Sequence, residues 1–511
     1  MKVRALALCL LALTAPVMAG CLKSAPEAPA AVPVAAPAPS MNVTREGVFH
    51  EAGGLPVDPA LVASIPRAVG GEFLIGYDAS EPSIASDKDG GVYMTATGPS
   101  AVGPSEPTIV ATFDHGKTFK DVGPKGANGV PHPASFDQIV AVDRDTGRIF
   151  MDDIIPLSCG TLSYSDDKGA SWTVDPYSCG NTDVNDHQTV GTAKPRMLPT
   201  VAYPNVVYRC TNNGVYSGCA TSLNGGLSFL PQTFAFEPGY ECGGLTSHLR
   251  SGPDGTMYLP KADCPSGPTV AYSKDDGLTW QKLVIKTDQA ATDPADDHEM
   301  GFAVGKNHDM YALWEHKGQV WFSASVDDGK TWFPARNVTA PGVTATMFNT
   351  LAMGDDGKVA FAYVGSTVPG GYEGKGAGNP GLSGDLQGQP RLPEWDNATW
   401  NAYLGVILNA TDPKAPIQTV TANDPSDPIA RGLCGRTRCH GMNDFIELTI
   451  DSDGRPWASF VDTCTKECVK DPKVLSDQTQ GMMATLLEGP ALRGANATLP
   501  ILPAQMPKAS G

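Results

Sequence analysis

An eight-residue motif recurs along this chain and limits its fold more than any other feature. The pattern Ser-x-Asp-x-Gly-x-Ser/Thr-Trp occurs at 165–172, 273–280 and 325–332, and looser copies ending in Phe occur at 112–119 and 222–229. The five starts are 53, 57, 51 and 52 residues apart. Such a period indicates one structural unit that is copied along the chain and packs against its neighbours.

The motif suits a tight turn between two strands. Its Ser and Asp side chains can bond the turn backbone, and its Gly can adopt a positive φ without a steric cost. The final aromatic residue can then pack back between neighbouring sheets. We therefore expect the motif to build structure rather than to carry chemistry.

A second repeated element, an apolar strand, a Gly/Asp turn and another strand, lies upstream of each motif. Each copy would supply the first two strands of a four-stranded blade, and the motif would join the third and fourth. Where the motif is missing, 402–408 and 482–487 read as third strands, and 42–49 could add a strand that closes a ring. The copies lie at 82–94, 139–151, 248–259, 302–313, 350–363 and 446–460, with a degenerate copy at 189–209. The prediction is an all-β fold, a single β-propeller over 41–495, with seven blades and six as the alternative.

The eight-residue motif resembles the Asp-box, or BNR, repeat of sialidases and related β-propellers. The resemblance covers roughly residues 75–490 and implies that the boxes lie on the face away from an active site. Sialidases use three arginines, a Tyr nucleophile assisted by Glu, and an Asp acid/base. Their Phe/Tyr-Arg-Ile-Pro motif is missing here. The resemblance therefore suggests catalytic candidates without fixing them: Asp137, Glu299, Tyr403 and Arg250.

The first residues have the layout of an export signal. Lys2 and Arg4 precede an apolar run, and Met18-Ala19-Gly20-Cys21 resembles the lipobox of prokaryotic lipoproteins. We expect 1–20 to be a signal peptide, Cys21 to carry lipid, 21–40 to be an Ala/Pro-rich tether, and 496–511 to be a tail. The protein is thus expected at a cell surface or in a periplasm, with membrane contact through its lipid anchor only.

Cysteine usage agrees with export. Of 12 cysteines, Cys9 leaves with the signal and Cys21 takes the lipid, and an even remainder in an exported chain favours five disulfides over metal sites. Five Asn-x-Thr sequons, at Asn42, Asn337, Asn397, Asn409 and Asn496, are compatible with an extracellular glycoprotein. The expected pairs are Cys159 with Cys179, Cys210 with Cys219, Cys242 with Cys264, Cys434 with Cys468 and Cys439 with Cys464.

Polar residues stand at the entrances of the innermost strands, where a purely structural strand would be apolar. If they face the channel, they form an acidic, His-bearing mouth that could hold a divalent cation such as Ca²⁺ or titrate near neutrality. Hydrated polar lining is the alternative. When the repeated units are aligned on their apolar residues, these polar residues form one column of the alignment. The column contains Glu81, Asp137, His187, Thr246 and Glu299, with Asp186, His298 and Asp444 one position earlier. The insertion at 365–400 should overhang this mouth, and its Trp395 and Trp400 could stack on a sugar or pack structurally.

The net charge of the chain limits the classes of ligand that it can bind. With 37 Lys and Arg against 55 Asp and Glu, the net charge of -18 argues against nucleic acid as a ligand. We expect a surface-anchored propeller that recognises an extracellular glycan or a surface protein. The alternative is a sialidase-like exo-glycoside hydrolase, and a lyase or metal-dependent hydrolase built on the His column is a third hypothesis. Whether the chain is an enzyme stays open at this point.

Overall fold

The computed structural model of the chain is described for fourteen stretches. All of them fall in a compact unit spanning Val43–Gly511, separate from Met1–Asn42. They are 45–50, 58–98, 106–125, 137–154, 160–175, 186–212, 215–240, 242, 245–287, 299–368, 398–432, 434, 441–494 and 497–503.

Four sheets contain four antiparallel strands each, taken in chain order. Their strands are β7 (Gln138–Val142), β8 (Ile149–Ile154), β9 (Gly160–Ser165) and β10 (Thr173–Asp175); β11 (Asp186–Ala193), β12 (Val206–Asn212), β13 (Ser217–Ser222) and β14 (Thr233–Phe236); β15 (Arg250–Ser251), β16 (Met257–Lys261), β17 (Thr269–Ser273) and β18 (Gln281–Val284); β19 (Met300–Val304), β20 (Met310–His316), β21 (Gln319–Ser325) and β22 (Arg336–Asn337).

Two larger sheets complete the unit. One has the order β1-β26-β25-β24-β23, with β27 also paired to β25, and the other has the order β28-β29-β30-β2-β4-β5-β6, with β3 paired to β4. Their strands are β1 (Val48–His50), β23 (Ala345–Met353), β24 (Val359–Ser366), β25 (Thr399–Ile407), β26 (Ile417–Thr421) and β27 (Ala430–Arg431); β2 (Val69–Asp78), β3 (Ile84–Ser86), β4 (Val92–Gly98), β5 (Glu106–Thr112), β6 (Lys120–Asp121), β28 (Glu447–Ile450), β29 (Pro456–Asp462) and β30 (Gln480–Glu488).

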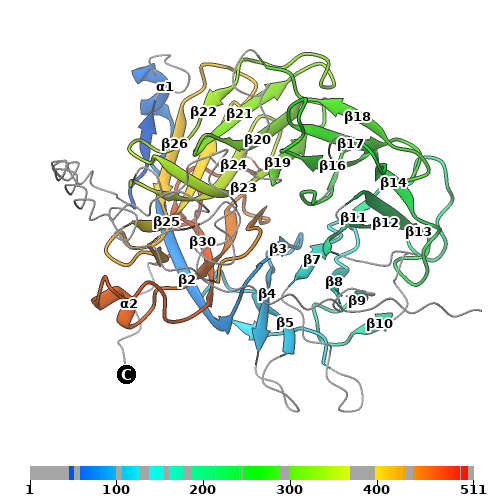
Figure 1. Cartoon of the computed structure of the whole chain (residues 1–511), viewed down its shortest axis with the longest axis horizontal. Helices are drawn as coiled ribbons and strands as arrows, with labels where there is room; N and C mark the ends of the chain where they lie inside the picture. Colours follow the sequence, from blue (N-terminus) through cyan, green and yellow to red (C-terminus); the bar gives the residue numbers. More distant parts are fainter. Residues whose placement is uncertain are drawn as a thin grey trace, which may run out of the picture. The chain divides into compact units, whose positions relative to one another are not determined.

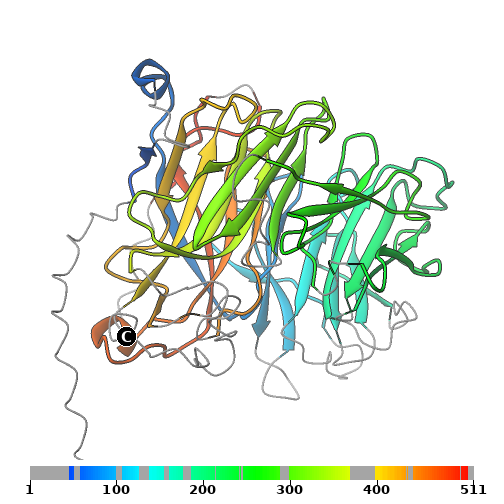
Figure 2. The ribbon, with the colours of Figure 1, turned by 45° about the horizontal axis from the view of Figure 1, so that its top comes forward.

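The innermost strands form a closed cycle. β3 contacts β7, which contacts β11, and the series continues through β15, β19, β23 and β28 back to β3. Figure 1 shows the sheets arranged about this common centre, and Figure 2 shows strands of successive sheets side by side. An all-β chain of four-stranded antiparallel sheets in this arrangement is consistent with a β-propeller. The predicted all-β fold class is confirmed, and the arrangement of the sheets is consistent with the predicted propeller.

An N-terminal strand pairs with the last strand of the chain. β2 runs antiparallel to β30 from Val69 to Asp78, whereas it meets β4 only at Asp78. The expectation that 42–49 closes the ring was wrong, because β1 pairs with β26 at the outer edge of another sheet. β2 is ten residues long and can bond along most of β30, whereas β1 has three residues.

All five eight-residue motifs form the same turn. In the copy at 325–332, Ser325 Oγ donates to Asp327 Oδ1 at 2.8 Å and accepts from Gly329 N at 2.9 Å, while Thr331 N donates to Asp327 Oδ1 at 2.9 Å. Gly329 has a φ of 76°, as predicted, and Asp328 before it also has a positive φ of 60°. Two successive left-handed residues match the twist of the strands they join.

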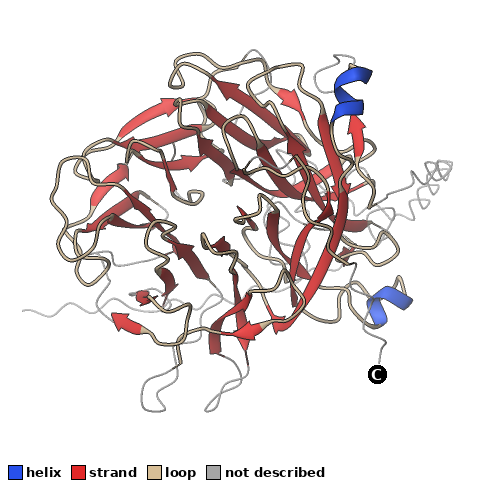
Figure 3. Ribbon diagram, turned by 180° about the vertical axis from the view of Figure 1, so that it is seen from behind, coloured by secondary structure: helices blue, strands red, loops and turns tan. Residues whose placement is uncertain are grey.

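The core lies between the sheets. Trp172, at the end of its motif, donates from Nε1 to the Val122 carbonyl at 2.8 Å and packs in a cluster with Tyr93 and Ile149. The predicted packing of the motif aromatic between sheets is confirmed there. Figure 3 shows the two short helices α1 (Pro59–Ser64) and α2 (Glu467–Lys470) outside the strands. No described helix has the length and apolar character needed to cross a membrane.

Two predicted disulfides are confirmed and two are wrong. Cys210 bonds Cys219 and Cys242 bonds Cys264. Cys464 bonds Cys468, four residues away, which excludes both Cys439–Cys464 and Cys434–Cys468. Cys434 is also disulfide-bonded. The remaining cysteines of the prediction, Cys159, Cys179 and Cys439, and the lipidation candidate Cys21 lie outside the described residues.

Part of the expected C-terminal tail packs on the unit. Leu499 and Leu502 are buried in the largest core cluster. Their backbone N–H groups donate to the carbonyls of Gly489 and Leu487 at 2.9 and 3.0 Å. Residues 497–503 therefore extend the folded region beyond the predicted limit of 495.

Candidate functional site

The inner strands surround a cavity of about 370 Å³. Residues of β3, β7, β11, β15, β19, β23 and β28 all line it. All seven strands lead from the side of the predicted mouth toward the turns that join them to the second strands of their sheets. One end of the cavity therefore receives residues at the beginnings of these strands, and the other end receives residues that follow them.

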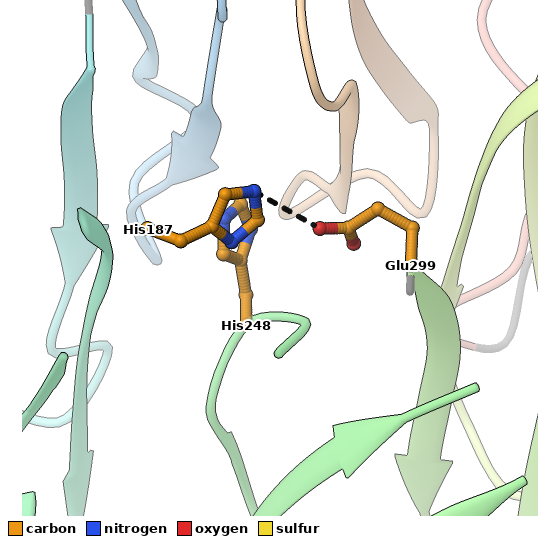
Figure 4. Close-up of side chains that lie close together, drawn as sticks. All are labelled: His187, His248 and Glu299. Atoms are coloured by element: carbon orange, nitrogen blue, oxygen red, sulfur yellow. Dashed lines mark ion pairs between the residues drawn. The ribbon is translucent and has the colours of Figure 1, made fainter. Parts of the chain in front are cut away.

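Three side chains converge near the beginning of the inner strands. They are His187, His248 and Glu299, and one donor atom of each lies within 4.8 Å of the others. His187 Nε2 is 3.6 Å from Glu299 Oε1, and Figure 4 shows this pair with the His248 side chain reaching up to the same place from its own segment. All three residues are buried, with 3%, 5% and 4% of their surface exposed.

A bulge at the start of β11 places His187. The pairing with β12 shifts between Asp186 and Thr189, and His187 has a φ of 48°, a conformation that non-glycine residues adopt only when their surroundings hold them there. His187 Nδ1 donates to the Thr246 carbonyl at 2.7 Å. Because a carbonyl can only accept, this bond puts the proton on Nδ1 and directs Nε2 toward Glu299.

His248 is held from its other ring nitrogen by a carboxylate. Its Nδ1 donates to Glu447, which also accepts from Arg250. Burial by itself would raise the pKa of the Glu447 carboxyl. The charges of Arg250 and then His248 outweigh burial and lower this pKa to about 2. Burial alone would lower the pKa of His248, yet Glu447 raises it above its ordinary value. The His248 Nε2 atom is buried and has no hydrogen-bond partner among the described residues.

Neighbouring residues fix the imidazole planes. The Phe445 ring stands edge-on to both, with centroids 5.2 Å from His187 and 4.6 Å from His248. Glu299 immediately precedes β19, and its carbonyl accepts from Asn349 Nδ2 at 3.1 Å. The three donor side chains thus come from three different sheets, and each is fixed by contacts of its own.

The donor types fit a small transition-metal dication, and the three donor atoms, which all lie within 4.8 Å of one another, would draw closer around it. Two donors bound at about 2.1 Å to a tetrahedral Zn²⁺ stand about 3.4 Å apart, close to the 3.6 Å between His187 Nε2 and Glu299 Oε1. Metal-binding histidines usually donate their second ring N–H to a carbonyl or carboxylate, as His187 and His248 do here. Ca²⁺ prefers an all-oxygen shell, so the two imidazoles favour Zn²⁺ or a related ion.

Four other acidic residues of the predicted mouth are described, and they do not join His187, His248 and Glu299. Asp137 is half-buried and its carbonyl accepts from Gln188, and Asp186 is exposed with its carboxylate on the His187 N–H. Glu81 and Asp444 are buried. None of these four belongs to the three converging donors. His298 and Trp395 lie outside the described residues.

Two predicted residues, Trp400 and Tyr403, have positions that differ from those expected, whereas Arg250 lies at the site. Trp400 is wholly buried and donates from Nε1 to the Gly432 carbonyl at 2.8 Å, so it is a core residue rather than a sugar platform. Tyr403 is buried in β25 and stacks on Tyr363 at 5.1 Å in a core cluster, and it is not one of the residues that line the cavity. Arg250 does reach the site, where it contacts Glu447.

Sequence reasoning missed His248, Glu447 and Phe445. The aligned column contained Thr246, whose carbonyl holds His187. Side chains two residues apart in an extended segment face the same way, so His248 could have been found as the next residue on the side of Thr246. Phe445 follows Asp444 directly and Glu447 comes two residues later, in the same strand entrance.

Comparison with known proteins gives distant likenesses only. No family model and no curated protein matches this chain. Similar solved structures include the intramolecular trans-sialidase from Ruminococcus gnavus, with 12% identity, a TM-score of 0.37, and coverage of 80% of this chain and 96% of that one. NanB sialidase from Streptococcus pneumoniae has 12% identity, a TM-score of 0.39, and coverage of 84% and 72%. Polysaccharide lyase Uly1 has 11% identity, a TM-score of 0.39, and coverage of 81% and 90%. Likenesses this distant leave the function to be argued from the site itself.

Proposed function

We propose that this chain is an exported β-propeller that binds a divalent transition metal in its channel and uses it on an extracellular glycan or another surface ligand. The observation that carries the proposal is the convergence of His187, His248 and Glu299. The disulfides support an exported protein. Lipid on Cys21 and the tether that follows would hold the propeller at a membrane surface.

We also propose seven blades rather than six. The closed cycle of seven inner strands supports this number. The eight-stranded sheet then consists of two blades, β28-β29-β30-β2 and β3-β4-β5-β6, which meet through one residue pair at Asp78 and Thr97. β1 and β27 are additions to the sheet of β23–β26.

Zn²⁺ is the ion that best matches the donors. Two imidazole nitrogens and one carboxylate oxygen form a set that tetrahedral zinc accepts, and three protein ligands leave the fourth position for water or substrate. A metal in such a position lowers the pKa of its bound water and polarises a substrate oxygen. The site therefore supports hydrolysis or a lyase reaction better than passive recognition.

Sialidase chemistry is less well supported. It would require a Tyr nucleophile next to a Glu, with arginines available for a carboxylate. Among the described residues, Tyr403 is in the core between sheets, and Arg250 is occupied by Glu447. The metal proposal accounts for Arg250 differently, as the residue that keeps Glu447 charged beside His248.

The test is the metal content of the full-length protein. Purified without chelator, it should show one bound Zn²⁺ per chain by native mass spectrometry, and chelation should lower its melting temperature because the ion binds only the folded state. The double variant His187→Gln/Glu299→Gln should not retain the ion. A metal-free protein that fails to take up added Zn²⁺, Co²⁺ or Mn²⁺ would overturn the proposal.

His50→Gln is a matched control. His50 is also a buried histidine, 9% exposed, but it lies in β1 at the outer edge of its sheet. This variant should keep the metal. Activity is then screened on extracellular polysaccharides with metal-loaded and with chelated protein. Equal turnover by the two preparations would show that the metal takes no part in the reaction.

A further inference from the structure

Two arginines line the channel cavity at the end opposite the metal-ligand candidates. Arg144 follows β7 in the turn that leads to β8, and Arg493 lies in a segment after β30. Leu492 next to it accepts from Asp355 N at 2.7 Å and donates to the Gly454 carbonyl at 2.8 Å. Those two residues belong to the turns after β23 and β28, so Arg493 lies at the same end as Arg144.

Both arginines line the same cavity, where the charge of one acts on the other. Burial and, after it, the positive charge of Arg144 lower the pKa of Arg493 to about 10, against the opposing charges of Asp355 and Asp451. Two guanidinium groups that repel one another inside one cavity form an unfavourable arrangement in a protein with a net charge of -18. An anion between them would relieve that repulsion.

No carboxylate of the described chain neutralises either guanidinium by a direct ion pair. Arg144 Nη1 donates to Ser86 Oγ and the Ile450 carbonyl, both at 2.9 Å, and Arg493 Nη2 donates only a long bond of 3.4 Å to the Met353 carbonyl. These partners are uncharged. In addition, Arg493 Nε is buried without a hydrogen-bond partner among the described residues.

The carboxylates whose charge acts on Arg144 or Arg493 are Asp87, Asp355 and Asp451, and each already accepts hydrogen bonds from other groups. Asp87 accepts from Asp89 N and Gly91 N at 2.8 Å and from the Tyr93 hydroxyl at 2.7 Å. Asp451 Oδ1 accepts from Asp453 N at 3.0 Å and from Arg455 N at 2.9 Å, and its Oδ2 accepts from Trp457 Nε1 at 2.9 Å. Asp355 Oδ2 accepts from Gly494 N at 2.8 Å. These carboxylates raise the arginine pKa values only from a distance. They cannot turn toward the guanidinium groups without leaving backbone donors unsatisfied.

We propose that Arg144 and Arg493 form a binding site for the acidic group of a sugar acid that occupies the channel cavity. Guanidinium groups bind carboxylate and sulfate oxygens through paired, charge-assisted hydrogen bonds. The cavity, at about 370 Å³, is within the range of small-molecule sites. Its walls combine hydroxyls of Ser86, Thr189 and Thr449 with aliphatic side chains, a mixture that suits a polyhydroxylated ring.

This site is separate from the metal proposal and does not depend on it. It also lies on the side of the turns between first and second strands, whereas the sialidase resemblance would place an active site at the opposite mouth. The full-length protein is titrated by calorimetry with D-glucuronate and, as the neutral counterpart, D-glucose. We expect glucuronate to bind and glucose to bind at least about tenfold more weakly, since hydrogen bonds between charged groups contribute about 1.5–3 kcal/mol.

Arg493→Met is the informative variant, because the Arg493 side chain makes one long hydrogen bond within the described part of the chain, and its loss should leave the fold intact. It should weaken glucuronate binding at least about tenfold. Arg144→Lys, which keeps a charge but loses the planar donor pair, should weaken it less. Arg67→Met removes an exposed arginine whose ion pair with Glu46 is at the surface, and it should leave binding unchanged.

Chelated protein separates this site from the metal. Binding of glucuronate that persists after chelation and fails in Arg493→Met, with an unchanged melting temperature, would support the proposal. Three results would overturn it: equal binding of glucuronate and glucose, no measurable binding of glucuronate, or affinity that depends on the metal and not on Arg493.

Discussion

The two ends of the channel are built from the same seven inner strands but hold opposite chemistry. Where the strands begin, His187, His248 and Glu299 converge, and their outer contacts fix the ring nitrogens. Where the strands end, the hydrogen-bond partners of Arg144 and Arg493 among the described residues are uncharged. One end can take a cation and the other an anion. The difference shows that strand direction alone sorts residues into two separate sites, because every inner strand runs the same way.

The largest expected effect tests whether Glu447 positions the cation end. Glu447→Gln keeps the side-chain shape but removes the charge that orients His248 and Arg250. Loss of such an outer partner usually weakens metal binding about 10–100-fold, and we expect a shift of this size in a Zn²⁺ competition titration.

Arg250→Gln is the comparison for that variant. It removes the other partner of Glu447 but leaves the His248 contact in place, so it should change Zn²⁺ affinity less than Glu447→Gln. If both variants lower the melting temperature and neither changes Zn²⁺ affinity, Glu447 only supports the fold.

A smaller effect on stability should show that the turn motifs support the fold without influencing the metal site in the channel. Asp327→Ala removes the acceptor of Ser325 Oγ, Thr331 N and Thr331 Oγ1. Lost hydrogen bonds of this kind cost about 1–2 kcal/mol, visible as a lower melting temperature, while metal content should stay the same. Val326→Ala, at an exposed position of the same motif, should change neither. Metal loss in Asp327→Ala would mean that the turns and the channel are coupled.

The smallest expected effect concerns Asp462, a buried carboxylate that has other carboxylates near it, whereas Glu447 has cations beside it. Burial raises the pKa of Asp462 well above its ordinary value, and the carboxylates of Asp427, Glu72 and Asp477 raise it further, although the Cys464 N–H opposes them. The folded state then retains a proton that the unfolded state releases above about pH 4, so stability should fall as the pH rises through that window.

Asp462→Asn removes this titration. We expect the variant to be more stable than the parent at pH 8 by at least about 1 kcal/mol, with the difference shrinking toward pH 4 in urea unfolding. An equal difference at both pH values would show that Asp462 is ionised in the folded protein. Glu447 is equally buried but has Arg250 and His248 beside it, so the two carboxylates differ in whether a cation opposes the effect of burial.

Much of the fold could be predicted because each turn motif contains its own hydrogen-bond network. Ser325, Asp327 and Gly329 determine their turn locally, so all five copies were readable from sequence. The partner of β30 could not be predicted, since any extended segment near the N-terminus could pair with it. The spacing of Cys434, Cys439, Cys464 and Cys468 allows three pairings, and choosing among them required coordinates.

The candidate site was predictable only in part. Polarity at strand entrances identified His187 and Glu299, because polar residues in apolar strands are conspicuous. His248 lay two residues from the aligned column, and Glu447 was hidden within a predicted strand. Tyr403 and Trp400 were misplaced because an aromatic residue that packs between sheets has the same sequence signature as one that faces a ligand.

The pairing of β2 with β30 has a consequence for how the protein matures. The two strands are separated by nearly the whole folded chain, and β2 emerges early during synthesis or export while its partner emerges almost last. Until then β2 has an unpaired edge, which is a template for pairing with other chains. Contacts so distant in sequence also form slowly. A cell that makes this protein therefore has to keep β2 from associating wrongly until synthesis of the polypeptide is almost complete.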